Sequence, residues 1–381
     1  MQNKKTEDNL FIEIILFPIV YIFFAIFTSS AGMRVFYFIY VAIFIATYMN
    51  FFLRIKKDMC ILIIAIFFKW IYDLLFFRDT LSDSLLLGIF IIVSYIFSEK
   101  ELRVRYILYL IKNEKTVFKY YILYFIALII SILLGNGIST EWGTISLQGP
   151  YGLAHILAYE LLIIAANAFI CYQVVGHVRW LIMVGICLGL IALTTVRTVL
   201  LAAFVVIIYY FLVRKDYKKI LYMFAGGVAF LILLRYTNLF SFVLEKTVNA
   251  INNGSITNYR SKIWESSLNF FLDGNLVEKV LGGGLSNLMK WNLTHVNMEI
   301  QAHNDVLTVL SAFGIVALVP YLFFVIKLSK GKGRFGFLFS LFVLITFNGL
   351  YSYCSFVLGI ISFRCLFECI NPKKYKMKRT A

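Results

Sequence analysis

Long apolar runs separated by short polar segments dominate the pattern of this chain. A helix of about 20 apolar residues crosses the hydrocarbon core of a bilayer, because each residue advances the helix by about 1.5 Å. The pattern therefore predicts an all-α, polytopic membrane protein with about twelve transmembrane helices. The expected spans lie at about 10–28, 35–53, 59–77, 84–98, 120–135, 151–175, 180–195, 198–213, 220–234, 303–326, 336–351 and 354–370.

The largest polar interval divides the chain into three parts. It covers residues 235–302 and carries apolar and aromatic residues at spacings that favour amphipathic helices lying on the membrane. We therefore expect spans one to nine in residues 1–234 and one large extracytoplasmic loop in residues 235–302. Spans ten to twelve and a basic cytoplasmic tail are expected in residues 303–381.

Composition supports a membrane protein, and charge predicts its orientation. Of the 381 residues, 61% are hydrophobic and 15% are charged, with a mean hydropathy of +0.85, which excludes an ordinary soluble domain. Of the 36 lysines and arginines, 25 fall in intervals expected on the cytoplasmic side, 9 on the other side and 2, Lys69 and Arg364, within spans. This asymmetry predicts cytoplasmic termini. It also accounts for the net charge of +16 without a nucleic-acid partner.

The patterns of cysteines and acidic residues predict no metal and no cofactor. The six cysteines lie in or beside apolar runs, and no His, Cys, Asp or Glu spacing resembles a metal site. Lys69 and Asp73 are four residues apart in the third span, so they fall on one helical face. A self-compensating ion pair is the favoured interpretation of these two charges, and a functional charge pair is the alternative.

The segment that follows the large loop holds the strongest candidate for chemistry. If this segment is helical throughout, five residues share one stripe, namely His303, Leu307, Leu310, Gly314 and Ala317, and Asp305 points to the opposite side. Gly314 and Ala317 remove side-chain bulk, so another helix can approach there. The stripe predicts a titratable imidazole at the membrane surface, above a tightly packed seam. The alternative is an interfacial histidine that makes only local hydrogen bonds.

Two arginines are candidates for holding an anion. Arg197 falls where the seventh span gives way to the eighth, and Arg260 precedes Ile263 and Trp264 in an amphipathic part of the loop. Arginine suits phosphate, because its guanidinium is permanently charged and binds two oxygens at once. The alternatives are a snorkelling arginine at a helix end and an ordinary surface arginine.

A glycine-rich turn, Gly282-Gly283-Gly284, follows in the same loop. Glycines permit close approach of two backbones and can present N–H groups to an anion. The turn lacks the Lys-Ser/Thr ending of a nucleotide-binding loop, so the sequence does not indicate a nucleotide site.

Three stretches in this order resemble a known family. They are LTTVR at 193–197, then YRSKIW at 259–264 with VLGGGL at 280–285, and finally His303-Asn304 followed by nine residues and Gly314. This arrangement is similar to the O-antigen ligase and polymerase family of bacterial surface polysaccharide synthesis, and the likeness covers roughly residues 190–320. Two departures are Ala317, where the family often has glycine, and Thr-Val-Arg, where it often has Ser-Arg.

The resemblance implies a metal-independent glycosyltransferase of the bacterial cytoplasmic (inner) membrane with an extracytoplasmic active site. Its donor would be an oligosaccharide repeat unit on undecaprenyl pyrophosphate, and its product an O-antigen or a capsule. Its implied partners besides membrane lipids are a flippase and a chain-length regulator of the same pathway. The implied site residues are His303 for catalysis, Arg197 and Arg260 for the diphosphate, and, as supporting residues, Asn304, Trp264, Gly282, Gly284 and Gly314.

Three functions compete at this point. A polymerase joins lipid-linked repeat units to each other, and a ligase moves the finished glycan to a different acceptor. We favour the polymerase, because polymerases are the more numerous and divergent class. A transporter of the same lipid-linked sugar is less favoured, since a transporter places polar residues near the bilayer midplane and most spans here lack them.

The charge asymmetry generates a prediction about orientation. A cysteine introduced as Ser255→Cys should react with a membrane-impermeant thiol reagent added from the extracytoplasmic side, because residues 235–302 are expected on the side opposite to the basic loops. Labelling that occurs only from the cytoplasmic side would contradict both the orientation and the expected position of the active site.

Overall fold

The computed structural model describes residues 2–28, 30–53, 57–77, 81–139, 146–215, 217–218, 221 and 260–369, and the chain there is almost entirely helical. The first part contains α1 (Gln2–Phe27), α2 (Ser30–Leu53), α3 (Lys57–Phe76), α4 (Leu81–Phe97), α5 (Lys100–Lys112), α6 (Glu114–Leu133), the antiparallel strands β1 (Ile138–Ser139) and β2 (Ser146–Leu147), the 3-10 turn η3 (Gly149–Tyr151), α7 (Ala154–Val175), α8 (Val178–Leu193) and α9 (Arg197–Val213). The second part contains α12 (Arg260–Asp273), α13 (Leu276–Leu281), α14 (Leu285–Val296), α15 (Asp305–Thr308), the π-helical turn η4 (Val309–Phe313), α16 (Gly314–Ser329), α17 (Arg334–Phe347) and α18 (Cys354–Glu368). The all-α class is confirmed.

Four helical segments are long and apolar enough to cross a membrane: Asp8–Phe27, Glu114–Leu133, Ala154–Val175 and Asp305–Ser329. Shorter apolar helices lie at Gly32–Phe44, Ser82–Phe97, Val178–Leu193, Arg197–Val213 and Arg334–Phe347. Helices α3 and α18 occupy two further positions at which spans are expected. The expected span at 220–234 lies outside the described residues except for residue 221. The count of twelve spans therefore stays a prediction.

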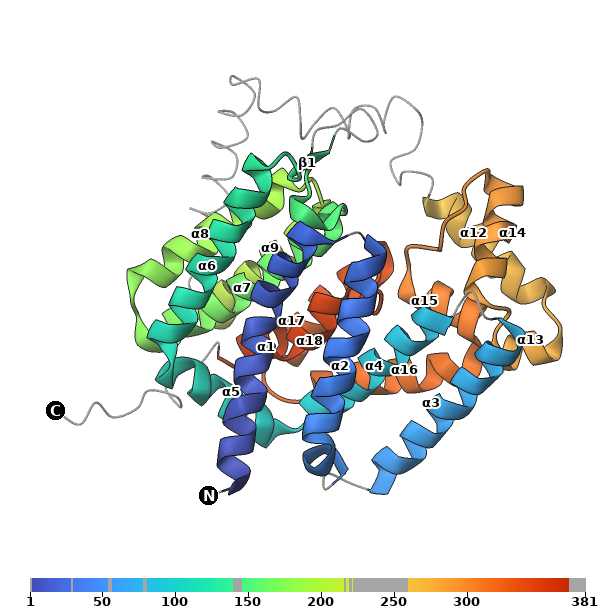
Figure 1. The fold of residues 1–381 in the computed structure, drawn as a ribbon, viewed down its shortest axis with the longest axis horizontal. Coiled ribbons are helices and arrows are strands. Elements are labelled where there is room, and N and C mark those ends of the chain that lie inside the picture. Colours follow the sequence, from blue (N-terminus) through green and yellow to red (C-terminus); the bar gives the residue numbers. More distant parts are fainter. Residues whose placement is uncertain are drawn as a thin grey trace.

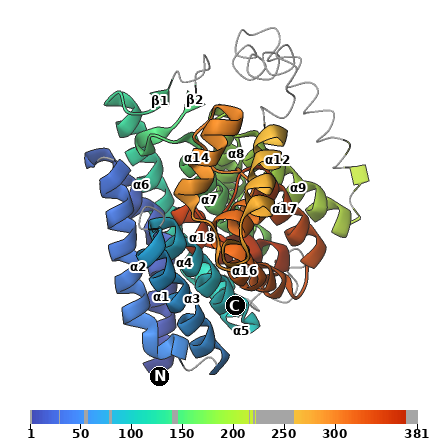
Figure 2. The same ribbon diagram turned by 90° about the vertical axis from the view of Figure 1, so that its right-hand side faces the viewer.

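Helices α7 and α18 lie at the centre of the helical body. Side chains of α7 are buried along most of its length, and α7 packs on both α8 and α18. Helix α1 packs on α6, α16 on α4, and α17 on α9. The three helices of the large loop, α12 to α14, gather beside α15 and α16 at the right of Figure 1. In Figure 2, α12 and α14 lie toward the same end of the molecule as β1 and β2.

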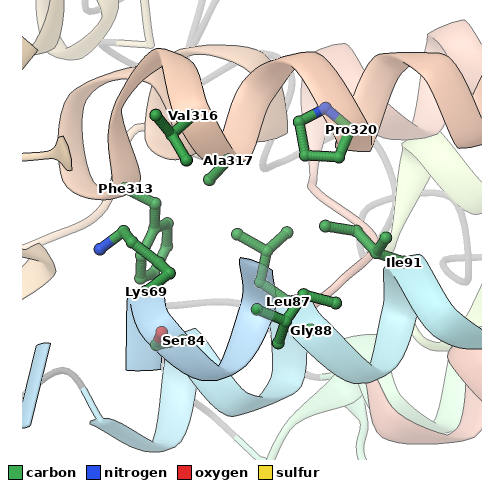
Figure 3. Close-up of a pocket in the computed structure, with 10 residues that line it drawn as sticks. Lys69, Ser84, Leu87, Gly88, Ile91, Phe313, Val316, Ala317 and Pro320 are labelled. Atoms are coloured by element: carbon green, nitrogen blue, oxygen red, sulfur yellow. The ribbon is translucent and has the colours of Figure 1, made fainter. Parts of the chain in front are cut away.

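An ion pair within α3 faces α4 and is largely buried. Lys69 donates a hydrogen bond to Asp73, and Ser84 Oγ donates to the other carboxylate oxygen of Asp73 at 2.5 Å. Lys69 and Ser84 border a small hollow that is otherwise lined by mainly apolar residues, among them Leu87 and Ala317 on opposite walls (Figure 3). The structure thus confirms the self-compensating pair that the spacing predicts, and the pairing reduces the cost of burying a lysine here.

Arg364, the other cation expected within a span, is also compensated. Its Nε and Nη2 donate to the carbonyls of Leu328 and Lys330, both at 2.9 Å, and Nη2 lies 3.2 Å from the Glu368 carboxylate. Arg103 of α5 donates to the same carboxylate at 2.9 Å. These contacts tie α5 and α18 to the turn between α16 and α17. The buried charges therefore hold the helices together at the end of α16 that is distant from His303.

Candidate active site

The segment around His303 is not one continuous helix. Helix α15 begins at Asp305, because the Asn304 side chain caps it by accepting the N–H of Leu307 at 3.2 Å. His303 precedes this cap and has a φ of +50°, a region that few residues other than glycine adopt. The stripe expected to run from His303 along a helix is therefore wrong, whereas the membrane-length segment expected at about 303–326 is found at Asp305–Ser329. Because the helix begins only after the Asn304 cap, His303 lies outside it. The π-helical turn then changes the direction in which the side chains after it point around the helix axis.

The N–H groups of the glycine-rich turn bind the π-helical turn. Gly283 donates to the carbonyl of Ser311 at 3.1 Å, and Gly284 donates to the carbonyl of Ala312 at 3.0 Å. A π-helical turn disturbs the regular ladder of hydrogen bonds, so its carbonyls need partners from elsewhere. The hypothesis that this turn presents its N–H groups to an anion is therefore wrong.

Gly282 and Gly314 bring two backbones into direct contact. A Cβ added to Gly282 would lie 2.3 Å from the carbonyl oxygen of Ala312, and one added to Gly314 would lie 2.4 Å from that of Val280. Both glycines have a positive φ, +95° and +78°, which other residues rarely adopt. The third N–H of the turn, that of Gly282, donates to Glu278 within the loop at 2.7 Å. Gly314 thus admits the C-terminal end of helix α13 together with the glycine turn, and the close approach of another helix that the sequence predicts here is confirmed.

Trp264 fixes the residue before His303. Its indole Nε1 donates to the carbonyl of Ala302 at 2.9 Å. On the same helix, the carbonyl of Ser267 accepts a hydrogen bond from Ser311 Oγ at 2.8 Å. Helix α12 is thereby joined both to the segment that carries His303 and to the π-helical turn. The supporting position that the resemblance implies for Trp264 has a physical basis in this contact.

The three residues predicted for catalysis and anion binding influence one another electrostatically. Burial and, second, the positive charge of Arg260 lower the pKa of His303 to about 4. Burial and, second, the charge of Arg197 lower the pKa of Arg260. Arg197 is the first residue of α9 and is exposed, whereas Arg260 begins α12 and is half-buried. The fold therefore brings three segments that are distant in sequence into one positively charged region.

His303 is held as a neutral imidazole in this region. A ring with a pKa of about 4 carries no charge at neutral pH. Its Nδ1 atom is buried and has no hydrogen-bond partner among the described residues. A buried polar atom without a partner is costly in a folded protein, and it marks a position at which a ligand can bind. Among the described residues no group of three His, Cys, Asp or Glu side chains is close enough to hold a metal.

A second group of residues adjoins Arg260, and sequence reasoning assigned no role to it. Asp305 is buried, and its Oδ2 accepts the hydroxyl of Tyr321 at 2.6 Å and the N–H of Leu350 at 2.7 Å. These bonds attach the turn between α17 and α18 to the start of α15. Tyr353 of that turn and Tyr159 of α7 both act on the Arg260 charge. Because no motif or spacing connects these residues, the one available signal was the position of Asp305 two residues after His303.

The fold and the site together define a class of protein, namely an almost entirely helical protein with membrane-length helices and a cationic region beside a neutral histidine. Residues 182–322 match the family model described as O-antigen ligase. The match contains Arg197, Arg260, His303 and Gly314, and it confirms the resemblance to the O-antigen ligase and polymerase family. Residues 182–322 of the chain are therefore similar to this family. No curated protein matches the chain.

The contact between the glycine turn and the π-helical turn generates a prediction. Gly282→Ala places a methyl group against the Ala312 carbonyl, and relief of this clash should move the backbone by enough to cost about 1–3 kcal/mol in free energy of unfolding. Gly189→Ala on α8 is the matched control, because an added Cβ there meets nothing within 4 Å. Thermal unfolding in detergent measures both variants. Equal unfolding temperatures would contradict the assigned contact.

Proposed function

We propose that this chain is a glycosyltransferase that polymerises oligosaccharide repeat units carried on undecaprenyl pyrophosphate. It acts at the outer leaflet of the bacterial cytoplasmic membrane and makes an O-antigen or a capsule. The family match supports an enzyme that transfers glycans. The observation that carries the proposal is that Arg260 acts electrostatically both on a neutral His303 and on Arg197, because a lipid diphosphate donor needs cations for its leaving group and a base for the acceptor.

The proposed reaction uses each of these groups once. His303 removes the proton from the acceptor hydroxyl as its oxygen attacks the anomeric carbon of the donor sugar. The bond between that carbon and the diphosphate oxygen breaks, and its electron pair leaves with the diphosphate. Arg260 and Arg197 stabilise the negative charge of this leaving group through charge-assisted hydrogen bonds. The two guanidiniums supply the positive charge that a divalent cation would otherwise provide.

Substrate binding also tunes the base in this scheme. In the free protein, the charge of Arg260 is one of the two causes that keep the His303 pKa low. A diphosphate bound to Arg260 offsets that charge, so the pKa of His303 rises when the donor is in place. The imidazole thus becomes a stronger base in the complex than in the free enzyme.

A transporter is the second candidate from another class, and buried polar residues of the described helices bear on it. Asn167 of α7 is bonded to the hydroxyls of Tyr106 and Tyr121, and Tyr106 is bonded to Ser362 of α18. These groups satisfy one another and join helices. They therefore favour a structural role over a path for a polar substrate.

The proposal is tested with purified protein and a single lipid-linked repeat unit in the presence of EDTA. A ladder of lengthening lipid-linked glycans is the expected result. No ladder until a second acceptor is added would indicate a ligase, and transfer that requires Mg²⁺ or Mn²⁺ would contradict the metal-independent mechanism. No transfer with any acceptor would favour the transporter.

The same assay tests the three residues. His303→Ala should lower the rate by about 10²–10⁴ because the base is lost. Arg197→Ala and Arg260→Ala should each lower it by about 10²–10³ because charge stabilisation of the leaving group is lost. Arg260→Lys should recover little activity, since an ammonium cannot bind two oxygens in one plane. His295→Ala is the matched control, because that exposed ring stacks on Trp291 within the loop. Near-normal transfer by His303→Ala would remove the mechanism.

The pKa of His303 generates a prediction about pH. The base works only when neutral, so activity should be lost as the pH falls through its pKa. For kcat/KM, which reports the free enzyme, this loss should be centred near pH 4, well below the ordinary histidine value of 6.5. For kcat, which reports the complex, it should be centred at a higher pH, because bound diphosphate offsets Arg260. Coincident profiles centred at about 6.5 would contradict both the environment and the tuning of His303.

A further inference from the structure

The turn between α17 and α18 forms a side of the candidate site that lies outside the family match. Its last residue, Tyr353, precedes α18, and the matched region ends at residue 322. Phe347, the last residue of α17, packs against Trp264, which lies one turn along α12 from Arg260. The groups that act electrostatically on Arg260 include Tyr353. Tyr353 therefore lies close enough to Arg260 to act on its charge.

This turn is held in place by buried hydrogen bonds. Asp305 accepts the N–H of Leu350 at 2.7 Å. Tyr159 Oη donates to the carbonyl of Gly349 at 2.8 Å, and Asn348 Nδ2 donates to the Tyr159 hydroxyl at 3.3 Å. These bonds join the turn to α15 on one side and to α7 on the other. The position of Tyr353 beside Arg260 is thus fixed before any substrate binds.

Three aromatic rings lie together at this place. The Tyr353 ring lies 4.6 Å from the ring of Tyr159 and 5.9 Å from that of His155, and it is within 12° of parallel to His155. Tyr159 is fully buried, whereas Tyr353 and His155 are half-buried. Tyr159 therefore serves as support, and the other two rings keep surface that a ligand can contact.

We propose that Tyr353, backed by His155, is the stacking surface for the sugar ring that is bonded directly to the donor diphosphate. The inference rests on the proposed function, in which Arg260 holds the diphosphate. One bond joins this sugar to the diphosphate, so the sugar must lie against the surface next to Arg260. One face of a pyranose presents C–H groups, which pack well on the electron-rich face of an aromatic ring. Tyr353 then contributes to recognition of the first donor sugar.

The competing explanation is that Tyr353 only packs between α7 and α18 and supports Arg260. The two explanations differ for a lipid pyrophosphate that carries no sugar. A purely supporting tyrosine affects the binding of this ligand and of the glycosylated donor alike, because both use Arg260. A stacking tyrosine affects the glycosylated donor alone.

The experiment measures the affinity of the full-length protein in detergent for undecaprenyl pyrophosphate with and without its repeat unit. Tyr353→Leu should weaken binding of the glycosylated donor by about 5- to 10-fold, the range expected for loss of one aromatic contact, and leave the sugar-free lipid unchanged. Tyr353→Phe keeps the ring and should bind both ligands as the wild type does. Tyr172→Leu is the matched control, because Tyr172 is another half-buried tyrosine near the opposite end of α7.

The outcomes separate this inference from the proposed function. Equal weakening of both ligands by Tyr353→Leu, or of neither, overturns the stacking role while wild-type transfer continues. The stacking role is also overturned if Tyr353→Phe weakens donor binding as strongly as Tyr353→Leu, because the ring is then not the contact. A wild type that binds neither lipid and transfers nothing overturns the proposed function itself.

Discussion

The candidate site depends on a backbone-to-backbone contact between the glycine turn and the π-helical turn. Two N–H groups of the turn satisfy two carbonyls of η4, and side chains are excluded at Gly282 and Gly314. An unsatisfied carbonyl in a membrane-length helix is costly, so the irregular turn persists only because the loop supplies donors. This contact holds the helices of the large loop against the helix that follows His303. Without it, α12 and therefore Arg260 would lose a main attachment above the start of α15.

Neighbouring positive charges determine how readily the residues of the site carry a charge. Besides burial, which is the larger cause in both cases, Arg197 lowers the pKa of Arg260 and Arg260 lowers that of His303. The charged forms of Arg260 and His303 are therefore less stable than they would be without these neighbours. The described surroundings of Arg260 also include Tyr159 and Tyr353, which oppose this fall in its pKa only in part. A bound dianion would relieve this repulsion, which means that part of the binding free energy comes from the strain between the charges. Such a region is suited to an anion and poorly suited to a neutral ligand.

The C-terminal helices contribute to the site through one carboxylate. Asp305 stands two residues after His303 and binds the N–H of Leu350 and the hydroxyl of Tyr321. Through Asp305 the turn between α17 and α18 is joined directly to α15. This connection explains how Tyr353, which lies beyond the region of the family match, comes to stand beside Arg260.

Much of the architecture follows from the sequence itself. Apolar runs located most of the described helices, because a chain in a membrane must satisfy its backbone internally and so forms helices wherever side chains are apolar. The spacing of Lys69 and Asp73 predicts their ion pair, since residues four apart on a helix are neighbours. Residue types also singled out His303, Arg197 and Arg260, because imidazole and guanidinium chemistry is a property of the side chain.

Tertiary structure decided how these residues are presented. A periodic pattern assumes an unbroken helix, so it placed His303 on a helical stripe and could not include the cap at Asn304 or the π-helical turn. The π-helical turn is bound by α12 and the glycine turn, which are distant from it in sequence. The sequence also could not predict that Tyr353, His155 and Asp305 lie near one another. These residues are far apart along the chain, and they come together only when α7, α15 and α18 pack. The sequence by itself determined which chemical groups are available, and the packing of distant segments decided which of them meet and in which state of charge.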